Sequence, residues 1–538
     1  MEESAYKTDV VIAGGGLAGM VSALELLNAG KKVILLDRAE ESRFGGLAKE
    51  SFGGMFFVNT PHQRKAGIKD DVNLALHDWH SFAEFDDDAN WPKKWAELYV
   101  NSCTDEVYFW LKKHNIKFFP VVHWVERGWN KPGNSLPRFH MVWGTGHGLV
   151  AEIEKHLLGH KNAQNLQLLF KHKVTDISIE NGVAKGISGI NEENGESFEV
   201  EAEAVVIASG GICGNIEKVR QNWHQPWGDP PETILNGSHP EADGLLHDEI
   251  NKHNGNLTHM DKAWHYAAGV NHPRPHFEGH GLSLVPPKSA LWVKYTGERF
   301  PIPLITAYDT RFLVEEICKQ KKKYSWQILN IKIALKEMAV SGSESNRAFR
   351  EKNIFLLMKN ILFGNKELVN DLLNNCMDFV TANSIEELAG KMNALTGEND
   401  VDVNALKHSI LNYDANIERG PKFHNDEQLR RIAHTRQYKG DKVRTCKFQK
   451  IFDKSTLPLI AIREHILSRK TLGGIQTDLE CRVLSKEQQP IEGLFAVGEA
   501  AGFGGGGMHG LRSLEGTFLG ACVLTGRVAA KTISGKQL

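Results

Sequence analysis

The stretch "TDVVIAGGGLAGMVSALELLNAGKKVILLDR", residues 8–38, decides the fold of this chain. A short apolar run leads into the turn Gly14–Gly19, apolar residues at helical spacing follow, and a second apolar run ends at Asp37. In this succession of strand, turn, helix, strand and acid, Gly14 makes the tight turn and Gly16 lets the backbone approach a pyrophosphate. Gly19 lets the helix pack closely on the strand.

The glycine turn predicts a binding site for a dinucleotide. The pyrophosphate would face the unpaired amides and the positive dipole end of the helix that begins after Gly16. Asp37 lies 21 residues beyond Gly16, where a carboxylate can accept hydrogen bonds from a ribose diol. The alternative is a tight turn in an α/β domain without a cofactor, but the complete strand-turn-helix-strand context favours the binding site.

The composition is that of a globular protein with more than one domain. The chain has 538 residues, 41% hydrophobic and 24% charged, and a formal net charge of −2. This charge balance argues against a dedicated nucleic-acid or anionic-membrane surface, and the lack of a run of 18 apolar residues predicts no membrane span. Seven scattered cysteines without a Cys-x-x-Cys pair suggest neither a metal site nor a disulfide framework. We therefore expect reduced thiols in the cytoplasm.

Two further segments indicate which dinucleotide is bound. The segments "AEAVVIASGG" (202–211) and "GLFAVGEAAG" (493–502) are apolar strands that end in small residues and glycines. The glycine turn alone serves NAD as well as FAD. A chain whose first and last strands both end in glycine resembles the FAD domain of the two-dinucleotide-binding flavoproteins, in which the ligand lies stretched across the sheet. FAD is therefore the expected cofactor.

Several segments together resemble one flavoprotein family, that of fumarate reductase, succinate dehydrogenase and 3-ketosteroid Δ1-dehydrogenase. They are "GGLAKESFGGM" (45–55), "VVIASGGICGN" (205–215), "EADGLLHD" (241–248), "TLGGIQTDLECRVL" (471–484) and "IEGLFAVGEAAGFGGGGMHG" (491–510). The segments "PRFHMVWGTGHGLV" (137–150), "SGSESN" (341–346) and "HGLRSLEGTFLG" (509–520) resemble more closely the bacterial FAD-binding dehydrogenases within that family.

The resemblance implies an α/β fold with a Rossmann-like FAD-binding domain that is split in sequence. Residues 1–240 and 456–538 would form this domain, and residues 241–455 an inserted α+β capping domain. Within the cap, "NIFLLMKNILFG" (353–364) and "SIEELAGKMNALTG" (384–397) have the pattern of amphipathic helices. In this family the substrate lies between cap and flavin, and hydride passes between flavin N5 and a carbon next to a carbonyl or carboxylate.

The resemblance also implies which positions contact FAD. The glycines of the first turn would hold the pyrophosphate, Asp37 the ribose, and Glu499 the ribityl chain. The full expected set is Gly14, Gly16, Gly19, Asp37, Arg38, Gly45, Gly46, Ala48, Ser51, Gly53, Gly54, Val174, Ala208, Ser209, Gly210, Asp243, Gly498, Glu499, Gly516 and Thr517. The loop Leu47–Ser51 lacks the His that binds FAD covalently in the succinate dehydrogenase branch, so we expect the FAD to be non-covalent.

The start of a C-terminal helix is predicted at Gly516 and Thr517, with Thr517 as the capping residue. Its free amides and positive end, aimed at flavin N1 and O2, would stabilise the negative charge of the reduced flavin. The helix would thereby raise the reduction potential of the cofactor.

The substrate residues of the dicarboxylate enzymes are absent from this chain. Those enzymes use an Arg after a cap segment, a His before Thr-x-Gly-Gly and an Arg in the C-terminal segment. At these positions the chain has Ala307, Lys470 and Ser513, with Arg512 one place early. Fumarate or succinate chemistry is therefore not expected.

The ketosteroid dehydrogenases rely instead on tyrosines, and this chain has none after Tyr438. His509 is the residue of the C-terminal segment that can titrate near neutral pH, although a structural hydrogen bond is an alternative role. Arg512 would either meet a substrate oxygen or pair with Glu515, and Lys470 would either contact substrate or be solvated. Arg512, His509 and Lys470 are the candidate catalytic residues.

We expect an FAD-dependent oxidoreductase that forms or reduces a carbon–carbon double bond next to a carbonyl in a small or medium organic substrate. A 3-ketosteroid dehydrogenase is the alternative within enzymes. The alternative of another class is a non-catalytic flavin-binding electron carrier or subunit. The sequence does not indicate the electron partner, the direction of reaction or the oligomeric state.

Overall fold

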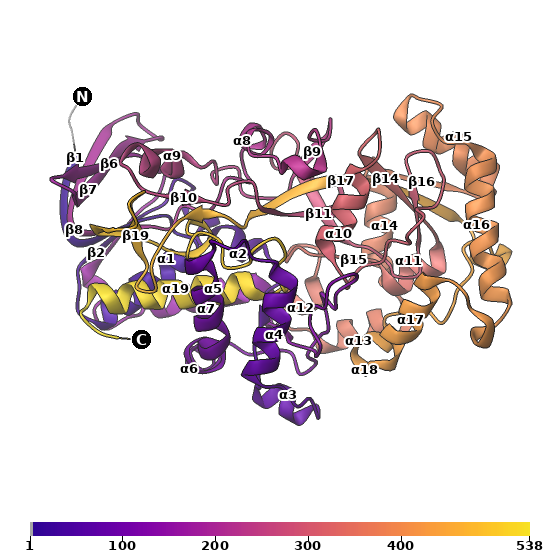
Figure 1. Cartoon of the computed structure of the whole chain (residues 1–538), viewed down its shortest axis with the longest axis horizontal. Helices are drawn as coiled ribbons and strands as arrows, with labels where there is room; N and C mark the ends of the chain where they lie inside the picture. Colours follow the sequence, from indigo (N-terminus) through magenta and orange to yellow (C-terminus); the bar gives the residue numbers. More distant parts are fainter. Residues whose placement is uncertain (1–3, 538) are drawn as a thin grey trace. The chain divides into compact units, whose positions relative to one another are not determined.

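The chain divides into two compact units in the computed structural model, which describes residues 4–537 (Figure 1). The first unit comprises the described residues up to Trp223, then Ser238–Trp264, and those from Arg469 onward. The second unit comprises His224–Gly237 and His265–Ser468. The first unit is therefore split in sequence by the second. The boundaries at residues 240 and 455 stay predictions.

A largely parallel sheet forms the centre of the first unit. Its strands lie in the order β19 (Arg482–Leu484), β20 (Pro490–Ala496), β7 (Val183–Asn191), β8 (Ser197–Ile207), β1 (Ser4–Ala13), β2 (Val33–Leu36) and β5 (Leu166–Leu169), with β6 (His172–Glu180) paired to β7. β1 pairs in parallel with β2 and β8, and β20 with β8. The strands are rich in buried Val, Ile and Leu, as expected of parallel strands covered on both faces. This is the Rossmann-like arrangement that the sequence predicts.

Two helices from opposite ends of the chain pack together in this unit. They are α1 (Leu17–Asn28) and α19 (Thr517–Ile533), which lie near each other in Figure 1. The Ser22 hydroxyl donates to the carbonyl of Gly526 at 3.2 Å, and a Cβ at Gly526 would lie 2.6 Å from the carbonyl oxygen of Ala18. The helices therefore approach at backbone contact distance.

The first unit contains further helices and two short strand pairs. They are α2 (Gly46–Glu50), β3 (Gly54–Phe56), α3 (Pro61–Lys65), α4 (Val72–Ala83), α5 (Asn90–Ser102), α6 (Phe109–Lys113), β4 (Phe139–Met141), α7 (Thr145–Leu158), α8 (Ile216–Gln221), α9 (Leu245–Lys252), β10 (Leu257–Thr258) and β18 (Gly474–Ile475). β3 pairs with β4, and β10 with β18.

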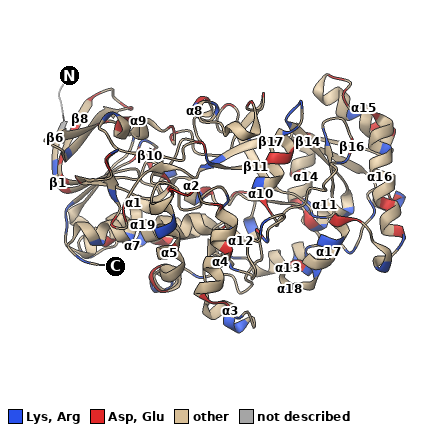
Figure 2. Ribbon diagram, viewed as in Figure 1, with Lys and Arg blue, Asp and Glu red and all other residues tan. Residues whose placement is uncertain are grey.

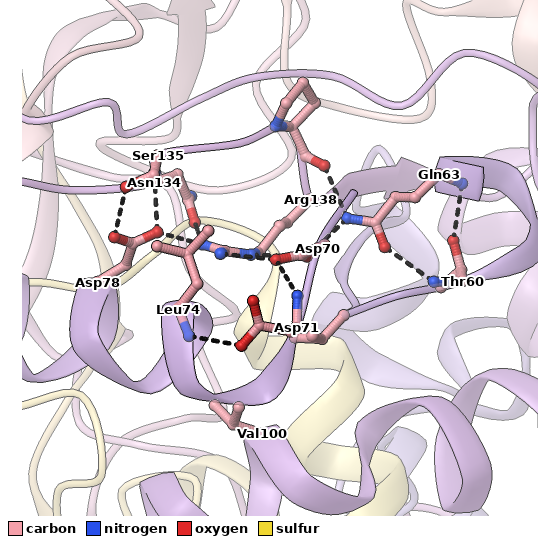
Figure 3. A network of polar contacts seen from close by, with 12 residues as sticks. Thr60, Gln63, Asp70, Asp71, Leu74, Asp78, Val100, Asn134, Ser135 and Arg138 are labelled. Carbon is pink, nitrogen blue, oxygen red and sulfur yellow. Dashed lines mark hydrogen bonds and ion pairs between the residues drawn. The ribbon is translucent and has the colours of Figure 1, made fainter. Parts of the chain in front are cut away.

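A buried ion network fixes α4 (Figure 3). Arg138 donates to both carboxylate oxygens of Asp70 at 2.8 and 2.9 Å and to Asp78 at 2.5 Å. All three side chains are 0% exposed. Asp78, on α4, also accepts from the amide and hydroxyl of Ser135 at 2.8 and 2.6 Å. Because both carboxylates are paired, the network ties α4 to the segment before β4.

The second unit has its own sheet and an outer set of helices. The strands lie in the order β13 (Leu291–Lys294), β14 (Tyr324–Asn330), β17 (Leu459–Thr471), β11 (Ala263–Asn271), β12 (Gly281–Val285) and β15 (Ala339–Val340), and β9 (Ile234–Asn236) and β16 (Phe379–Ala382) pair with β17. The helices are α10 (Thr310–Cys318), α11 (Ile331–Glu337), α12 (Arg347–Arg350), α13 (Ile354–Phe363), α14 (Lys366–Asn375), α15 (Ile385–Thr396), α16 (Val403–Glu418), α17 (Glu427–Gln437) and α18 (Lys439–Lys442).

Three predictions from the sequence concern thiols, membrane spans and amphipathic helices. All seven cysteines are free thiols, and six of them are buried. None of the helices within residues 4–537 combines the length and the apolar character needed to cross a bilayer. The two predicted amphipathic helices are confirmed as α13 and α15.

One carboxyl group in the second sheet lacks a partner. Glu464, on β17, is 0% exposed, and neither of its carboxylate oxygens has a hydrogen-bond partner among the described residues. Burial, together with the nearby charge of Asp378, raises the pKa of Glu464 well above its ordinary value of 4.5. The folded protein therefore holds Glu464 in its neutral form.

Replacing Glu464 by leucine is expected to stabilise the protein, and increasingly so as the pH rises. Because its pKa is raised on folding, the contribution of Glu464 to stability is complete below about pH 4.5 and is lost as the pH rises towards the folded pKa. The gain of the variant over the wild type should grow by up to about 1.4 kcal/mol per pH unit in that range.

Urea unfolding of both proteins at several pH values measures this gain. Glu464→Gln is the matched control, because it keeps the shape of the side chain and removes only the titration. The free energy of unfolding of both variants should depend less steeply on pH than that of the wild type. A difference from the wild type that stays constant with pH would contradict the prediction.

Candidate functional site

The turn between β1 and α1 has the glycine geometry that the sequence predicts. Gly14 has a φ of +117°, and a Cβ there would lie 2.3 Å from the carbonyl oxygen of Ala208. A Cβ at Gly19 would lie 2.1 Å from the carbonyl oxygen of Gly14, so α1 packs directly on the end of β1. The fold itself therefore requires glycine at both positions.

Gly16 is glycine for a different reason. Its own chain neighbours aside, no described atom lies within 4 Å of where its Cβ would be. It has an ordinary φ of −69° and precedes α1, whose first turn carries no acidic side chain. The first amides of α1 have no partner within the helix. An open glycine beside unpaired amides and a positive helix end fits the pyrophosphate of FAD.

The acidic residue after β2 is held by backbone amides. Asp37 accepts hydrogen bonds from the amides of Gly15 and Ala39, both at 2.7 Å, and burial raises its pKa. The next residue, Arg38, forms an ion pair with Asp243 at 2.8 Å. The structure thus brings Arg38 and Asp243 together, 205 residues apart in sequence, at the end of β2. Both were expected at the cofactor.

The loop of residues 45–54 lies beside this turn. The Gly45 amide donates to the carbonyl of Gly15 at 3.0 Å, and Gly45 forms a parallel bridge with Gly16. A Cβ at Gly46 would lie 3.6 Å from the Cα of Gly16. The predicted cofactor loop and the predicted pyrophosphate site are therefore adjacent.

The remaining predicted FAD positions in the N-terminal half lie on neighbouring strand ends or loops. The Ala208 amide donates to the carbonyl of Ala13 at 2.8 Å, which carries the β1–β8 pairing up to the glycine turn. Ser209 and Gly210 follow it, and Val174 is buried on β6. In the loop, the carbonyl of Ala48 accepts a hydrogen bond from the Ser51 hydroxyl at 2.7 Å. Gly53 packs against Gly146, and Gly54 packs against Phe139.

The second glycine segment lies against the first helix. A Cβ at Gly498 would lie 2.8 Å from the Cβ of Ala18 in α1. Glu499 accepts a hydrogen bond from the amide of Thr471 at 2.8 Å, and burial raises the pKa of Glu499 to about 7. The two glycine segments are therefore close enough to contact one extended ligand.

Several glycines of the run Gly502–Gly510 accommodate protein groups. A Cβ at Gly504 would lie 2.6 Å from the Trp95 ring, and a Cβ at Gly510 would lie 2.4 Å from the carbonyl oxygen of Ala83. Trp95 lies on α5 and Ala83 ends α4. Packing against these helices is thus a reason for the glycine run that the sequence did not reveal.

His509 is enclosed by aromatic rings. It is 0% exposed and stacks on Trp79 of α4 with ring centroids 5.7 Å apart. Burial and the nearby Lys470 lower the pKa of His509 to about 3. Its Nε2 lies 2.7 Å from the Thr517 hydroxyl, so the neutral imidazole holds the first residue of α19.

The helix start at residues 516–517 is confirmed, but the predicted cap is wrong. The N-cap is Gly516, with a φ of +102° and no side-chain cap. Thr517 is already inside the helix, and its hydroxyl bonds to His509 and, at 2.9 Å, to the Ser513 hydroxyl. The Thr517 side chain therefore binds residues of the preceding segment, His509 and Ser513, and does not cap the helix.

Arg512 and Lys470 lie on either side of this helix start. The Arg512 side chain is 11% exposed and pairs with Glu84, which follows α4; burial lowers the pKa of Arg512 to about 10. Lys470 lies 3.6 Å from Glu515 and 4.1 Å above the Phe518 ring, and burial lowers its pKa. Because His509 also contacts Phe518, Lys470 and His509 meet at this ring.

Sequence reasoning missed α4 as part of this site. Trp79 stacks on His509 and donates from Nε1 to the carbonyl of Met508 at 3.0 Å, and Glu84 pairs with Arg512. The signal in the sequence was a helix, residues 72–83, that carries an acid and a tryptophan on its buried side. Nothing in its local pattern pointed to a segment more than 400 residues away.

Within residues 4–537, no group of three or more His, Cys, Asp or Glu side chains is arranged to hold a metal ion. The site thus consists of two glycine segments at the ends of parallel strands, two helix N-termini, and a cluster of buried basic and aromatic side chains at the start of α19. The first part suits a dinucleotide. The second part suits an oxygen-bearing organic molecule.

Comparisons with known proteins agree with this geometry. The family model described as "FAD binding domain" matches residues 9–519. A KsdD-like steroid dehydrogenase of Mycobacterium tuberculosis is 38% identical over 542 residues, 97% of this chain and 95% of that protein.

Two solved structures share the fold. The 3-ketosteroid delta1-dehydrogenase of Sterolibacterium denitrificans, solved with 1,4-androstadiene-3,17-dione, is 16% identical with a TM-score of 0.72, and the match covers 98% of this chain and 99% of that one. A flavocytochrome c3 fumarate reductase in the open conformation is 19% identical with a TM-score of 0.68, covering 98% and 78%. At these identities the likeness concerns the fold alone.

Proposed function

Because the chain belongs to the FAD-binding flavoprotein family, we propose that it is a dehydrogenase of steroids or of similar apolar cyclic ketones. It is an FAD-dependent oxidoreductase that acts on carbon–carbon bonds next to a carbonyl. When bound, FAD supplies the acceptor or donor of hydride at its N5 atom. The observation that carries the choice of substrate is the nearly full-length similarity to a steroid dehydrogenase.

The residues around α19 support a ketone in preference to a dicarboxylate. Ser513, at the position of a substrate-binding Arg in the dicarboxylate enzymes, is 0% exposed and bonded to Thr517. Lys470 stands in place of the His and is paired with Glu515. Arg512 lies beside them and is paired with Glu84. A guanidinium has five N–H donors, so Arg512 can keep this pair and also donate to a single carbonyl oxygen.

His509 and Arg512 take different roles in this proposal. As a general acid His509 would start from its charged form, and as a general base it would have to become charged; burial disfavours the charged form at neutral pH. We assign it the positioning of Thr517, and through it of the first amides of α19 near flavin N1 and O2. Arg512 donates to the substrate oxygen and stabilises charge that develops there.

The remaining assignments concern the cofactor and its surroundings. The FAD is held without a covalent bond, because the loop 47–51 has no His and His62 is bonded to the Tyr108 hydroxyl at 2.8 Å. The free thiols suit a reducing compartment such as the cytoplasm. We assign the role of the capping domain to the second unit.

Anaerobic mixing of the oxidised holoenzyme with a 3-ketosteroid tests the substrate class. The flavin absorbance should bleach as the steroid is dehydrogenated, and the product should carry one more double bond. Bleaching by saturated acids but not by ketosteroids would exclude the steroid assignment. If reduced enzyme is instead reoxidised rapidly by enones, the reductive direction is the working one. Purified protein that reacts with neither class would overturn the substrate assignment and favour the electron-carrier alternative.

Arg512→Ala is expected to lower turnover by about a hundredfold or more while FAD stays bound, because one donor to the developing charge is lost. Single-turnover flavin reduction measures the chemical step. Glu84→Gln is the diagnostic companion, because it removes the partner of Arg512 and keeps the guanidinium. Equal losses in both variants would mean that only the ion pair matters.

A further inference from the structure

Helix α13 in the second unit turns apolar side chains outward. The exposed fractions are 85% for Phe355, 69% for Phe363, 67% for Leu362, 47% for Met358 and 46% for Ile354. At about 100° per residue, Ile354, Phe355, Met358 and Leu362 fall within roughly 100° of the helix circumference. This is the width of a face that a helix normally buries. An exposed apolar face of this kind marks an interaction site.

The charges around α13 are mostly positive. Residues 347–366 contain five basic side chains and one acidic one, a net charge of +4. The acid, Glu351, is paired with Arg347 at 3.1 Å. Lys352, Lys359 and Lys366 are exposed, and no ion pair involves them within the described part of the chain. In Figure 2 the ribbon of α13 is mostly tan. Lys359 lies within α13, whereas Lys352 precedes the helix and Lys366 follows it.

We propose that α13 binds the surface of an anionic lipid bilayer, with its apolar face in the headgroup region and the three lysines on lipid phosphates. Phenylalanine and leucine on one face with lysine beside them are the composition of interfacial helices. Each lysine near an anionic surface strengthens binding several-fold. The side chains are already in place, so the binding requires no refolding.

A second copy of the chain is a poorer occupant of this face. A two-fold symmetric contact would place α13 against itself, and the lysines of one copy would face those of the other. Such like charges repel each other when water is excluded. A bilayer with anionic headgroups complements both the apolar face and the charge.

The net charge of −2 for the whole chain led to the expectation of no anionic-membrane surface, and α13 shows how a local charge can differ from the total. Nor does the proposal depend on the substrate: it rests on the exposure and charge of residues 347–366. A steroid substrate would dissolve in the same bilayer, but failure of one assignment leaves the other standing.

Co-sedimentation of the holoenzyme with vesicles tests the proposal. The wild type should bind phosphatidylcholine vesicles that contain phosphatidylglycerol, and bind pure phosphatidylcholine vesicles at least about tenfold more weakly. The double variant Phe355→Ser, Leu362→Ser should lose at least about tenfold in binding to the anionic vesicles. Lys359→Glu should weaken binding to the anionic vesicles alone.

Leu158→Ser is the matched control, because Leu158 is 53% exposed on α7 of the first unit. It should bind vesicles like the wild type. Circular dichroism and flavin content should be unchanged in every variant, since the altered side chains are exposed. Wild-type protein that stays in solution with both vesicle types, or a double variant that binds as before, would overturn the proposal. A dimer that the double variant dissociates, with no vesicle binding, would assign α13 to self-association instead.

Discussion

Replacing Arg138 by alanine is expected to destabilise the first unit by about 3–5 kcal/mol, a large fraction of the stability of an ordinary domain. Arg138 is 0% exposed and pairs with two carboxylates, Asp70 and Asp78, that are equally buried. Removing the guanidinium leaves two buried negative charges without a counter-ion. Urea unfolding of the purified holoenzyme, followed by far-ultraviolet circular dichroism, measures the loss.

The loss of stability should depend on whether buried charges remain without partners. The triple variant Arg138→Met, Asp70→Asn, Asp78→Asn leaves no buried charge and is expected to regain a large part of the lost stability. Because Asp78 precedes Trp79, which stacks on His509, Arg138→Ala should also change the fluorescence of the protein. A loss below about 1 kcal/mol, in the range typical of surface pairs, would contradict the prediction.

Gly16→Ala is expected to weaken FAD binding by roughly a hundredfold, about 2.7 kcal/mol, while the protein stays folded. The added methyl group meets no protein atom and φ is −69°, so the fold tolerates it. It occupies the place where a pyrophosphate approaches the backbone. Fluorescence titration of the apoprotein with FAD measures the affinity.

Substitutions at two other glycines serve as comparisons for Gly16→Ala. Gly14→Ala should fail to fold properly, because its Cβ would lie 2.3 Å from a carbonyl oxygen at a φ of +117°. Gly390→Ala, in α15, has open space and should bind FAD normally. A Gly16→Ala protein with unchanged FAD affinity would place the pyrophosphate elsewhere.

Local patterns in the sequence predicted the first unit well, because its elements follow from local rules. The strand before Gly14 and the close approach at Gly19 are set by sterics within a few residues. The start of α19 was located, but Thr517 was assigned the wrong role. The Thr517 hydroxyl could have accepted from the helix amides, but it bonds instead to His509 and Ser513.

The parts that the sequence did not predict depend on distant contacts. The pairing of Arg512 with Glu84 joins segments 428 residues apart, and no spacing or periodicity connects them. The same holds for Trp95, which occupies the space that Gly504 leaves open. The outward orientation of α13 was also hidden, because an amphipathic pattern does not say whether its apolar face meets a core or a partner.

The split construction of the first unit has a consequence for how the protein is made. β1 and α1 leave the ribosome before the second unit, yet α1 packs on α19 and β8 pairs with β20. Both α19 and β20 are translated after residue 489. The second unit is complete once residue 468 has emerged. It can therefore fold during translation, whereas the first unit waits for its C-terminal segment to arrive. During that time the apolar surfaces of β1 and α1 lack their C-terminal partners and are exposed to aggregation.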